Sequence, residues 1–145
     1  LTGLGMQRGA SHVELIKGSE DGRFSLLETA ARVGGAHIAE QVEASTGLNL
    51  WEQWANLEID GPAYQVPAHR EEYGGLLMTL SKQEHADLSA FEGPELFYKA
   101  PEAWHAGMVL RTSSHERLME LVQSYSDRLR ADYNAFLPAP SKATH

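Results

Sequence analysis

The sequence predicts an α+β domain with a mostly antiparallel sheet and flanking helices. Two strand-like segments around a glycine-containing turn come first, two helical segments follow, and further strands lead into one long amphipathic helix. The chain has 145 residues, 42% of them hydrophobic, which is enough for one compact domain with a core. We therefore expect a domain over residues 1–137, made of the parts 1–60 and 61–137, and a tail over 138–145.

The first two strands are expected at residues 10–17 and 23–31, joined by the turn 18–22 as a hairpin. A two-residue loop, 21–22, would set Glu14 opposite Thr29. A three-residue loop, 20–22, with its glycine in the left-handed conformation, sets Glu14 opposite Glu28. The three-residue loop is preferred because it separates apolar from polar side chains more cleanly.

That register has further consequences for the hairpin. It pairs His12 with Ala30 and Ile16 with Leu26. It also leaves one apolar face, which carries Val13, Leu15, Leu27 and Ala31.

Two helices are expected after the hairpin. The first covers residues 36–45, with Gly47 placed to end it in the left-handed conformation. The second covers 50–59, capped by Asn49, and its apolar stripe includes two of the three tryptophans, all of which are expected in the core.

The second half of the chain is expected to form strands and a closing helix. Ser113 and Glu116 have the spacing of a capping box, and apolar residues recur at helical period from there to about Phe136. The strands are expected at 74–80, 95–100 and 108–112.

Composition excludes several classes of function. The net charge of −8 and pI near 5.3 argue against nucleic acid as a partner, since phosphate binding needs a basic face. The absence of cysteine excludes disulfides and thiolate metal sites. No apolar run approaches the roughly 20 residues of a membrane span. The start at Leu1 lacks both an initiator Met and a signal peptide, so we expect a piece of a larger cytoplasmic protein.

The hairpin carries the candidate chemistry. Opposite each other, Glu14 and Glu28 would have Cβ atoms about 4.5–5.5 Å apart, and two carboxylates that close repel unless a cation lies between them. Mg²⁺ or Mn²⁺, which prefer oxygen ligands, would fit there. Arg32 lies four residues beyond Glu28 on the same face and could bind anionic oxygens. Spacing alone also permits two exposed glutamates with Arg32 as their ion-pair partner.

The same residues resemble the C-terminal half of the ATP-grasp domain, found in biotin carboxylase, carbamoyl-phosphate synthase and L-amino acid ligases. The family pattern is a strand bearing a Glu, a hairpin, and a strand with Glu-x-Asn-x-Arg. Glu14, Glu28 and Arg32 match its first Glu, second Glu and Arg. The resemblance implies that the glutamates bind the metal ions that bridge ATP phosphates, and that Arg32 faces a phosphate or acyl-phosphate.

One branch of the family is closest in pattern. The sequence from His12 to Glu14, and the Arg-x-Gly-Gly that begins at Arg32, resemble carboxylate–amine ligases. This implies that ATP phosphorylates a carboxylate substrate and an amine substrate attacks the acyl-phosphate, with His12 as a substrate contact or acid–base group. Ala30 departs from the pattern because it replaces the Asn, a metal ligand. The lid and lysines that contact ATP belong to a preceding N-terminal ATP-grasp portion, which this chain lacks before Ala10.

Other residues and other functions stay open. His37, Glu40 and His105 are weaker site candidates, since a solvated or structural role suits them as well. A self-contained metal hydrolase using His12, Glu14 and Glu28 is one alternative. A non-catalytic ATP-grasp-derived binding module is another, and a homodimer is compatible with it.

Overall fold

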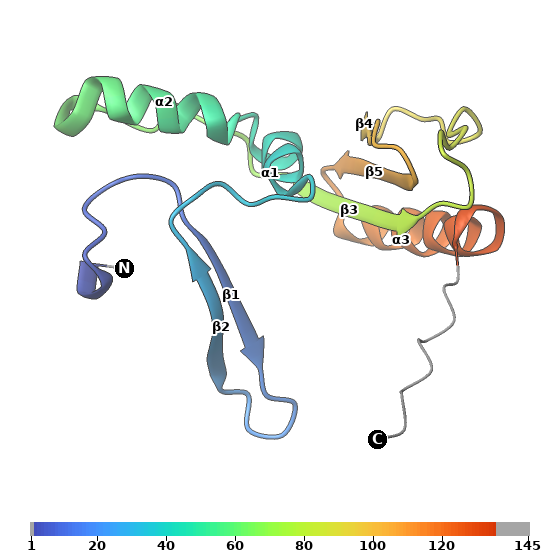
Figure 1. Cartoon of the computed structure of the whole chain (residues 1–145), viewed down its shortest axis with the longest axis horizontal. Coiled ribbons are helices and arrows are strands. Elements are labelled where there is room, and N and C mark those ends of the chain that lie inside the picture. The colour runs from blue at the N-terminus through green and yellow to red at the C-terminus, as the bar shows by residue number, and fades with distance from the viewer. Residues whose placement is uncertain (1, 136–145) are drawn as a thin grey trace, which may run out of the picture.

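The structure is a computed structural model that describes residues 2–135 (Figure 1). The predicted tail at 138–145 lies outside these residues. The last helix, predicted to run to about Phe136, ends at Arg128 and is followed only by a turn that reaches Tyr133. The elements are β1 (His12–Lys17), β2 (Phe24–Ala30), α1 (Ile38–Thr46), α2 (Leu50–Asp60), β3 (Tyr73–Leu80), β4 (Leu96–Lys99), β5 (His105–Thr112) and α3 (His115–Arg128). Short 3₁₀ turns cover Thr2–Leu4 and Gly61–Ala63, and a π-helical turn, Leu129–Tyr133, follows α3.

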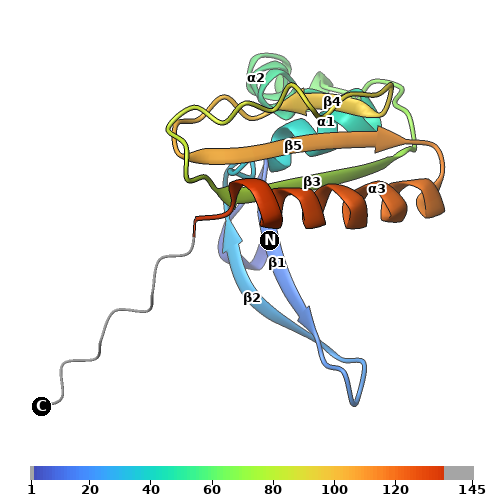
Figure 2. The same ribbon diagram turned by 90° about the vertical axis from the view of Figure 1, so that its right-hand side faces the viewer.

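The described strands form two antiparallel sheets, a β1–β2 hairpin and a three-stranded sheet in the order β3-β5-β4. Figure 2 shows α3 on one side of the larger sheet and α1 on the other. Two glycines in β3 explain this close approach. A methyl group at Gly74 would lie 2.9 Å from the Gln41 carbonyl oxygen in α1, and one at Gly75 would lie 2.9 Å from Leu118 Cδ1 in α3. The predicted α+β class is confirmed.

The main core lies between the larger sheet and α3. Alternate residues of β3 and β5 face the helix, as period-two alternation of a strand requires. Burial of this apolar surface is the main term that stabilises the fold. Its buried members are Leu77, Leu88, Phe91, Ala106, Met108, Leu110, Leu118, Leu121 and Leu129. In the described part of the chain, no helix has the length and apolar character needed to cross a membrane.

Local signals predicted the end of α1 and the start of α2 correctly. Gly47 ends α1 in the left-handed conformation, and the Asn49 side chain accepts hydrogen bonds from the backbone N–H groups of Trp51 and Glu52. The predicted cap of the last helix is wrong by one residue. Ser114, not Ser113, caps α3, because its hydroxyl accepts from the Arg117 N–H at 3.2 Å.

Two further predictions need correction. The helix predicted from residue 36 begins at Ile38, because Ala36 and His37 adopt left-handed backbone conformations with φ of 50° and 65°. The tryptophans predicted in the core include two that are half exposed, Trp51 and Trp104, each at 53%. Both lie at the edge of cavities instead.

The hairpin register is confirmed for two pairs, His12 with Ala30 and Glu14 with Glu28. The predicted pairing of Ile16 with Leu26 is wrong, because the register shifts by one residue after Glu14 and Ile16 pairs with Ser25. A β-bulge of this kind adds one residue to one strand. The connection beyond Lys17 and Phe24 is also longer than three residues, although Gly22 is left-handed as predicted, with φ of 66°.

The hairpin extends away from the larger sheet in both views (Figures 1 and 2). Its predicted apolar face is exposed among the described residues, with Leu15 at 56% and Leu27 at 61%. Leu26, which pairs with Leu15 on that side, is exposed at 61%, and on the opposite side Ile16 is exposed at 54%. The hairpin therefore presents apolar surface on both sides.

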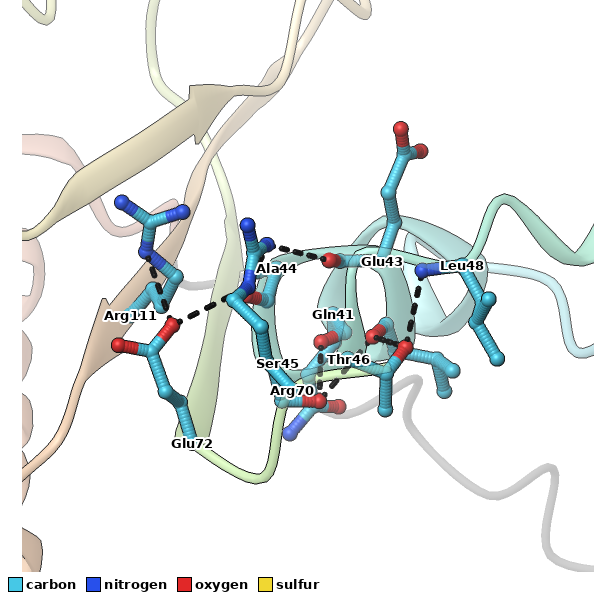
Figure 3. Close-up of polar contacts among 10 residues, drawn as sticks. Gln41, Glu43, Ala44, Ser45, Thr46, Leu48, Arg70, Glu72 and Arg111 are labelled. Atoms are coloured by element: carbon cyan, nitrogen blue, oxygen red, sulfur yellow. Dashed lines mark hydrogen bonds and ion pairs between the residues drawn. The ribbon is translucent and has the colours of Figure 1, made fainter. Parts of the chain in front are cut away.

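The C-terminal end of α1 is held by the segment before β3 (Figure 3). The backbone N–H groups of Arg70 and Glu72 donate to the carbonyls of Thr46 and Ser45, at 2.8 and 3.0 Å. The Arg70 guanidinium donates to the Ala44 carbonyl at 3.4 Å and pairs with Glu72 Oε2 at 3.4 Å. These contacts satisfy the carbonyls that every helix end leaves without partners.

We expect Arg70→Ala to lower the free energy of unfolding by about 1 kcal/mol, because it removes a cationic cap from the negative end of α1. Urea denaturation followed by circular dichroism measures the change. Arg23→Ala, which removes an exposed arginine from the hairpin turn, is the matched control and should unfold like the unaltered chain. Equal loss in both variants would contradict the capping role of Arg70.

Candidate functional site

The hairpin brings the two predicted metal-binding carboxylates together. Glu14 of β1 and Glu28 of β2 are directly opposite each other, and the bulge that disturbs the register lies beyond them. Directly opposite residues in an antiparallel pair have Cβ atoms about 4.5–5.5 Å apart. The Glu14 side chain is 44% exposed, so a ligand can approach it from solvent.

The other two predicted site residues lie beside this pair. His12 Nδ1 is 3.9 Å from Glu14 Oε1, and the His12 side chain is 23% exposed. Arg32 donates from Nη1 to the Val33 carbonyl at 3.0 Å, rather than to either glutamate. Among the described residues, Arg32 therefore forms no ion pair with Glu14 or Glu28, which was the alternative that the spacing permitted.

The chemistry of the donor set fits a magnesium ion shared with phosphate. Mg²⁺ is usually bound by one or two carboxylates, with substrate phosphates and water as the other ligands. Among residues 2–135, no group of three or more His, Asp or Glu side chains is arranged to hold a metal. His12, Glu14 and Glu28 therefore do not form the three-ligand centre that a self-contained hydrolase would need. Glu14 and Glu28 still fit an ion that takes its other ligands from phosphate and water.

A tight bend connects the hairpin to α1. A methyl group at Gly34 would lie 2.9 Å from Ile38 Cγ2, so Ile38 leaves no room for a side chain there, and it would touch His12 Cδ2 at 3.6 Å. The left-handed residues of the bend are Ala36 and His37, not the glycines. Left-handed non-glycine residues store about 1 kcal/mol or more of strain and cluster at functional sites.

The bend forms one wall of a cavity of about 400 Å³. Segment 34–40 faces Glu102 and His105 across it, and the indole of Trp51 and the thioether of Met78 supply apolar surface. A methyl group at Gly35 would lie 3.8 Å from Arg32 Nη1, so this wall is shared with the predicted phosphate-binding arginine. The hairpin carboxylates and the cavity are thus joined through a short stretch of chain.

The His37 imidazole connects two carboxylates inside the cavity. Its Nε2 is 2.9 Å from Glu102 Oε2, and its Nδ1 is 3.5 Å from Glu40 Oε2. The His37 side chain is 11% exposed, and its ring lies 5.2 Å from the ring of Tyr98. The weaker predicted candidates, His37, Glu40 and His105, therefore gather at one cavity.

Glu102 is a residue that the sequence did not mark. It is 65 positions from His37, in a short segment before β5, and no local pattern identifies it. Burial acts to raise the pKa of its carboxyl. Hydrogen bonds from its own backbone N–H and from His37, together with the charges of His37 and His105, outweigh burial and hold the pKa below its ordinary value of 4.5.

We expect the Glu102 carboxylate to contribute about 0.5 kcal/mol of stability, a small value because it is half exposed. A lowered folded-state pKa makes this contribution complete above pH 4.5, and it disappears as the pH falls through the folded-state value. Urea unfolding of the unaltered chain and of Glu102→Gln should therefore differ at pH 6 and converge near pH 3. A stability difference between the two proteins that grows as the pH falls would contradict a stabilising role for the Glu102 carboxylate.

Comparison with known proteins bears on the fold. No family of known domains matches the sequence, and no curated protein does. The crystal structure of phosphoribosylglycinamide synthetase from Anaerococcus prevotii matches 94% of this chain with a TM-score of 0.59 at 14% sequence identity. The match covers 39% of that protein, so the chain spans less than half of its length.

This neighbour is an ATP-grasp ligase. The likeness confirms the predicted fold, a C-terminal portion of an ATP-grasp fold, and at this identity it speaks for the fold alone. It does not distinguish the carboxylate–amine ligase branch from others.

Proposed function

We propose that this chain is part of an ATP-dependent carboxylate–amine ligase and supplies the metal–phosphate half of its site. The observation that carries the proposal is the position of Glu14 directly opposite Glu28, on a hairpin of a chain with an ATP-grasp fold. Both carboxylates are accessible to a ligand, and Arg32 lies at the end of the same hairpin. The proposed cofactors are ATP and Mg²⁺, which Mn²⁺ can replace.

Each residue has a defined role in this proposal. Glu14 and Glu28 hold the ion against the phosphate oxygens of ATP, and His12 positions the Glu14 carboxylate, from which it is 3.9 Å away. Arg32 turns from the Val33 carbonyl to bind the phosphoryl group or the acyl-phosphate, which a long flexible side chain permits. The bound ion supplies charge neutralisation for the transferred phosphoryl group. Catalysis of this kind depends mainly on positioning and electrostatic stabilisation.

A second portion of protein completes the site in this proposal. The lid and the lysines that contact ATP would come from an N-terminal ATP-grasp portion, and the carboxylate substrate would lie between the two portions. The exposed apolar side chains of the hairpin, such as Phe24 at 67% and Leu26 at 61%, are surface that such a portion would cover. Apolar surface of this kind marks sites of protein contact.

A non-catalytic ATP-grasp-derived module is the second candidate function. The observation in its favour is Ala30, which stands two residues after Glu28 where the family pattern has a metal-binding Asn. A methyl group offers no ligand, so one coordination position is left to water. Such a module would bind a metal–nucleotide complex weakly or pair with a second copy through its exposed hairpin.

Titration with Mn²⁺ tests the proposed site directly. In amide NMR spectra of the chain, Mn²⁺ should broaden the signals of Glu14, Glu28 and their neighbours in β1 and β2 first. Glu14→Gln and Glu28→Gln should each weaken this binding about tenfold, because each removes one of the two charged ligands. Glu20→Gln, which removes the same charge from the turn of the same hairpin, is the control and should bind as the unaltered chain does. Unchanged broadening in both site variants would overturn the metal-ligand role.

A further inference from the structure

The cavity of about 400 Å³ lies next to the proposed phosphate site and is open to a second ligand. A methyl group added at Gly34 would lie 3.6 Å from His12 Cδ2, and one at Gly35 would lie 3.8 Å from Arg32 Nη1, so this wall is near both residues. A molecule in the cavity would therefore lie beside the place where an acyl-phosphate would be held. This position suits the second substrate of the ligation, which must reach the activated carbonyl carbon.

The charge of the cavity selects the kind of ligand. Two carboxylates, Glu40 and Glu102, line it together with two histidines, and no Lys or Arg is among its lining residues in the described chain. An anionic group would meet two carboxylates that no lysine or arginine of the lining offsets, whereas a cationic group would be attracted to them. The cavity therefore suits a protonated amine and not a free carboxylate.

The remaining walls suit a short hydrocarbon body. Trp51 and Met78 face the cavity, and Ala39 lies on the α1 side. An aromatic ring near a cation adds attraction to its hydrophobic contact, and a thioether packs against flexible carbon chains. Trp51 is half exposed, which leaves its ring available to a ligand.

The polar wall of the cavity is already ordered. The ring of His37 is fixed by Glu102 at 2.9 Å, Glu40 at 3.5 Å and the neighbouring ring of Tyr98. The left-handed backbone at 36–37 directs this ring toward Glu102 rather than into a normal helix cap. A preformed wall lowers the ordering cost of binding.

We propose that this cavity is the amine-substrate site, where Glu40 and Glu102 bind a primary ammonium group and Trp51 and Met78 contact its carbon chain. The assignment rests on the proposed ligase function, because an amine is one substrate of that reaction. It goes beyond that function by locating the amine and by naming the groups that recognise it.

Titration with n-butylammonium chloride, sodium butyrate and butan-1-ol tests this site by amide NMR of the chain. n-Butylammonium should shift the signals of residues 34–40 and 102–105 in a saturable way. Butyrate, with the same carbon chain and the opposite charge, should bind at least about tenfold more weakly, and the neutral alcohol should fall between them. Equal binding of butyrate, or shifts confined to other parts of the chain, would overturn the assignment.

Variants test the recognising groups. Glu102→Gln and Glu40→Gln should each raise the Kd for n-butylammonium about fivefold or more, since each replaces a charged acceptor with a neutral one. Glu92→Gln removes an equal charge from an exposed loop position outside the cavity and should leave the Kd unchanged. Well-dispersed amide spectra show that each variant is folded. An unchanged Kd in both cavity variants would overturn the role of the carboxylates.

The Mn²⁺ titration of the same samples separates this inference from the function on which it rests. Loss of the ammonium site with normal Mn²⁺ broadening at Glu14 and Glu28 would remove the amine assignment alone. Loss of Mn²⁺ broadening with normal ammonium binding would instead overturn the metal–phosphate role and leave an amine-binding cavity without the proposed reaction.

Discussion

Gly107→Ala should lower the free energy of unfolding by about 3 kcal/mol, the upper end of the usual cost of overpacking a core. Gly107 lies in the middle of β5, between its two neighbouring strands, and pairs with Met78. A methyl group there would lie 2.7 Å from the Leu77 carbonyl oxygen and would also collide with the Met78 side chain. The thioether can move, but the carbonyl belongs to the backbone of β3 and cannot move without disturbing the sheet.

Urea denaturation of Gly107→Ala against Gly3→Ala isolates this crowding. A methyl group at Gly3 would meet nothing within 4 Å, so the control adds the same group in open space. Gly3→Ala should be neutral to within about 0.5 kcal/mol, or slightly stabilising through the unfolded chain. A Gly107→Ala variant as stable as this control would contradict the close pairing of β3 with β5.

Ala30→Asn should strengthen Mn²⁺ binding about tenfold, because it adds an amide oxygen to a site with two carboxylate ligands. Residues two apart in a strand share a face, so the new side chain would lie beside Glu28. A cavity of about 150 Å³ borders Ala30 and leaves room for the larger residue. The variant would also restore the Glu-x-Asn-x-Arg pattern.

The gain in Mn²⁺ affinity should depend on which residue of the strand carries the added amide. Ala31→Asn, one residue further along the chain, adds the same amide where strand alternation would direct it away from Glu28. It should bind Mn²⁺ as the unaltered chain does. Broadening in amide NMR, repeated at several Mn²⁺ concentrations, gives both affinities. Equal affinity for Ala30→Asn and the unaltered chain would contradict the placement of residue 30 beside the ion.

Features of the hairpin show how far local sequence reasoning extends. The pairing of Glu14 with Glu28 was predicted correctly, but the three-residue loop from which it was predicted is wrong, and a bulge in the ladder restores the pairing. The bulge was not predicted, although the extra residue interrupts the alternation of β2 at the successive leucines Leu26 and Leu27. The exposure of Leu15 and Leu27 could not be predicted either, since an apolar face does not identify what packs against it.

The helix ends and the cavity also separate features that local sequence predicts from features that depend on the folded structure. The Asn49 cap and the Gly47 terminus depend on a few neighbouring residues and were predicted correctly. The start of α1 was missed because the left-handed conformation of Ala36 and His37 opposes their intrinsic preference and is held by the surroundings. Glu102 reaches His37 only through the pairing of β5 with β3 and the packing of α1 on that sheet, which no local pattern shows.

Phosphorus NMR of Mg–ATP tests the central claim most directly, because it observes the phosphates rather than the protein. Added chain should shift or broaden the β- and γ-phosphate signals in the presence of Mg²⁺. The effect should be lost without Mg²⁺ and in a Glu14→Gln/Glu28→Gln double variant, while Glu20→Gln should retain it. Identical phosphate signals for the double variant and the unaltered chain would contradict a role for Glu14 and Glu28 in holding the metal against ATP.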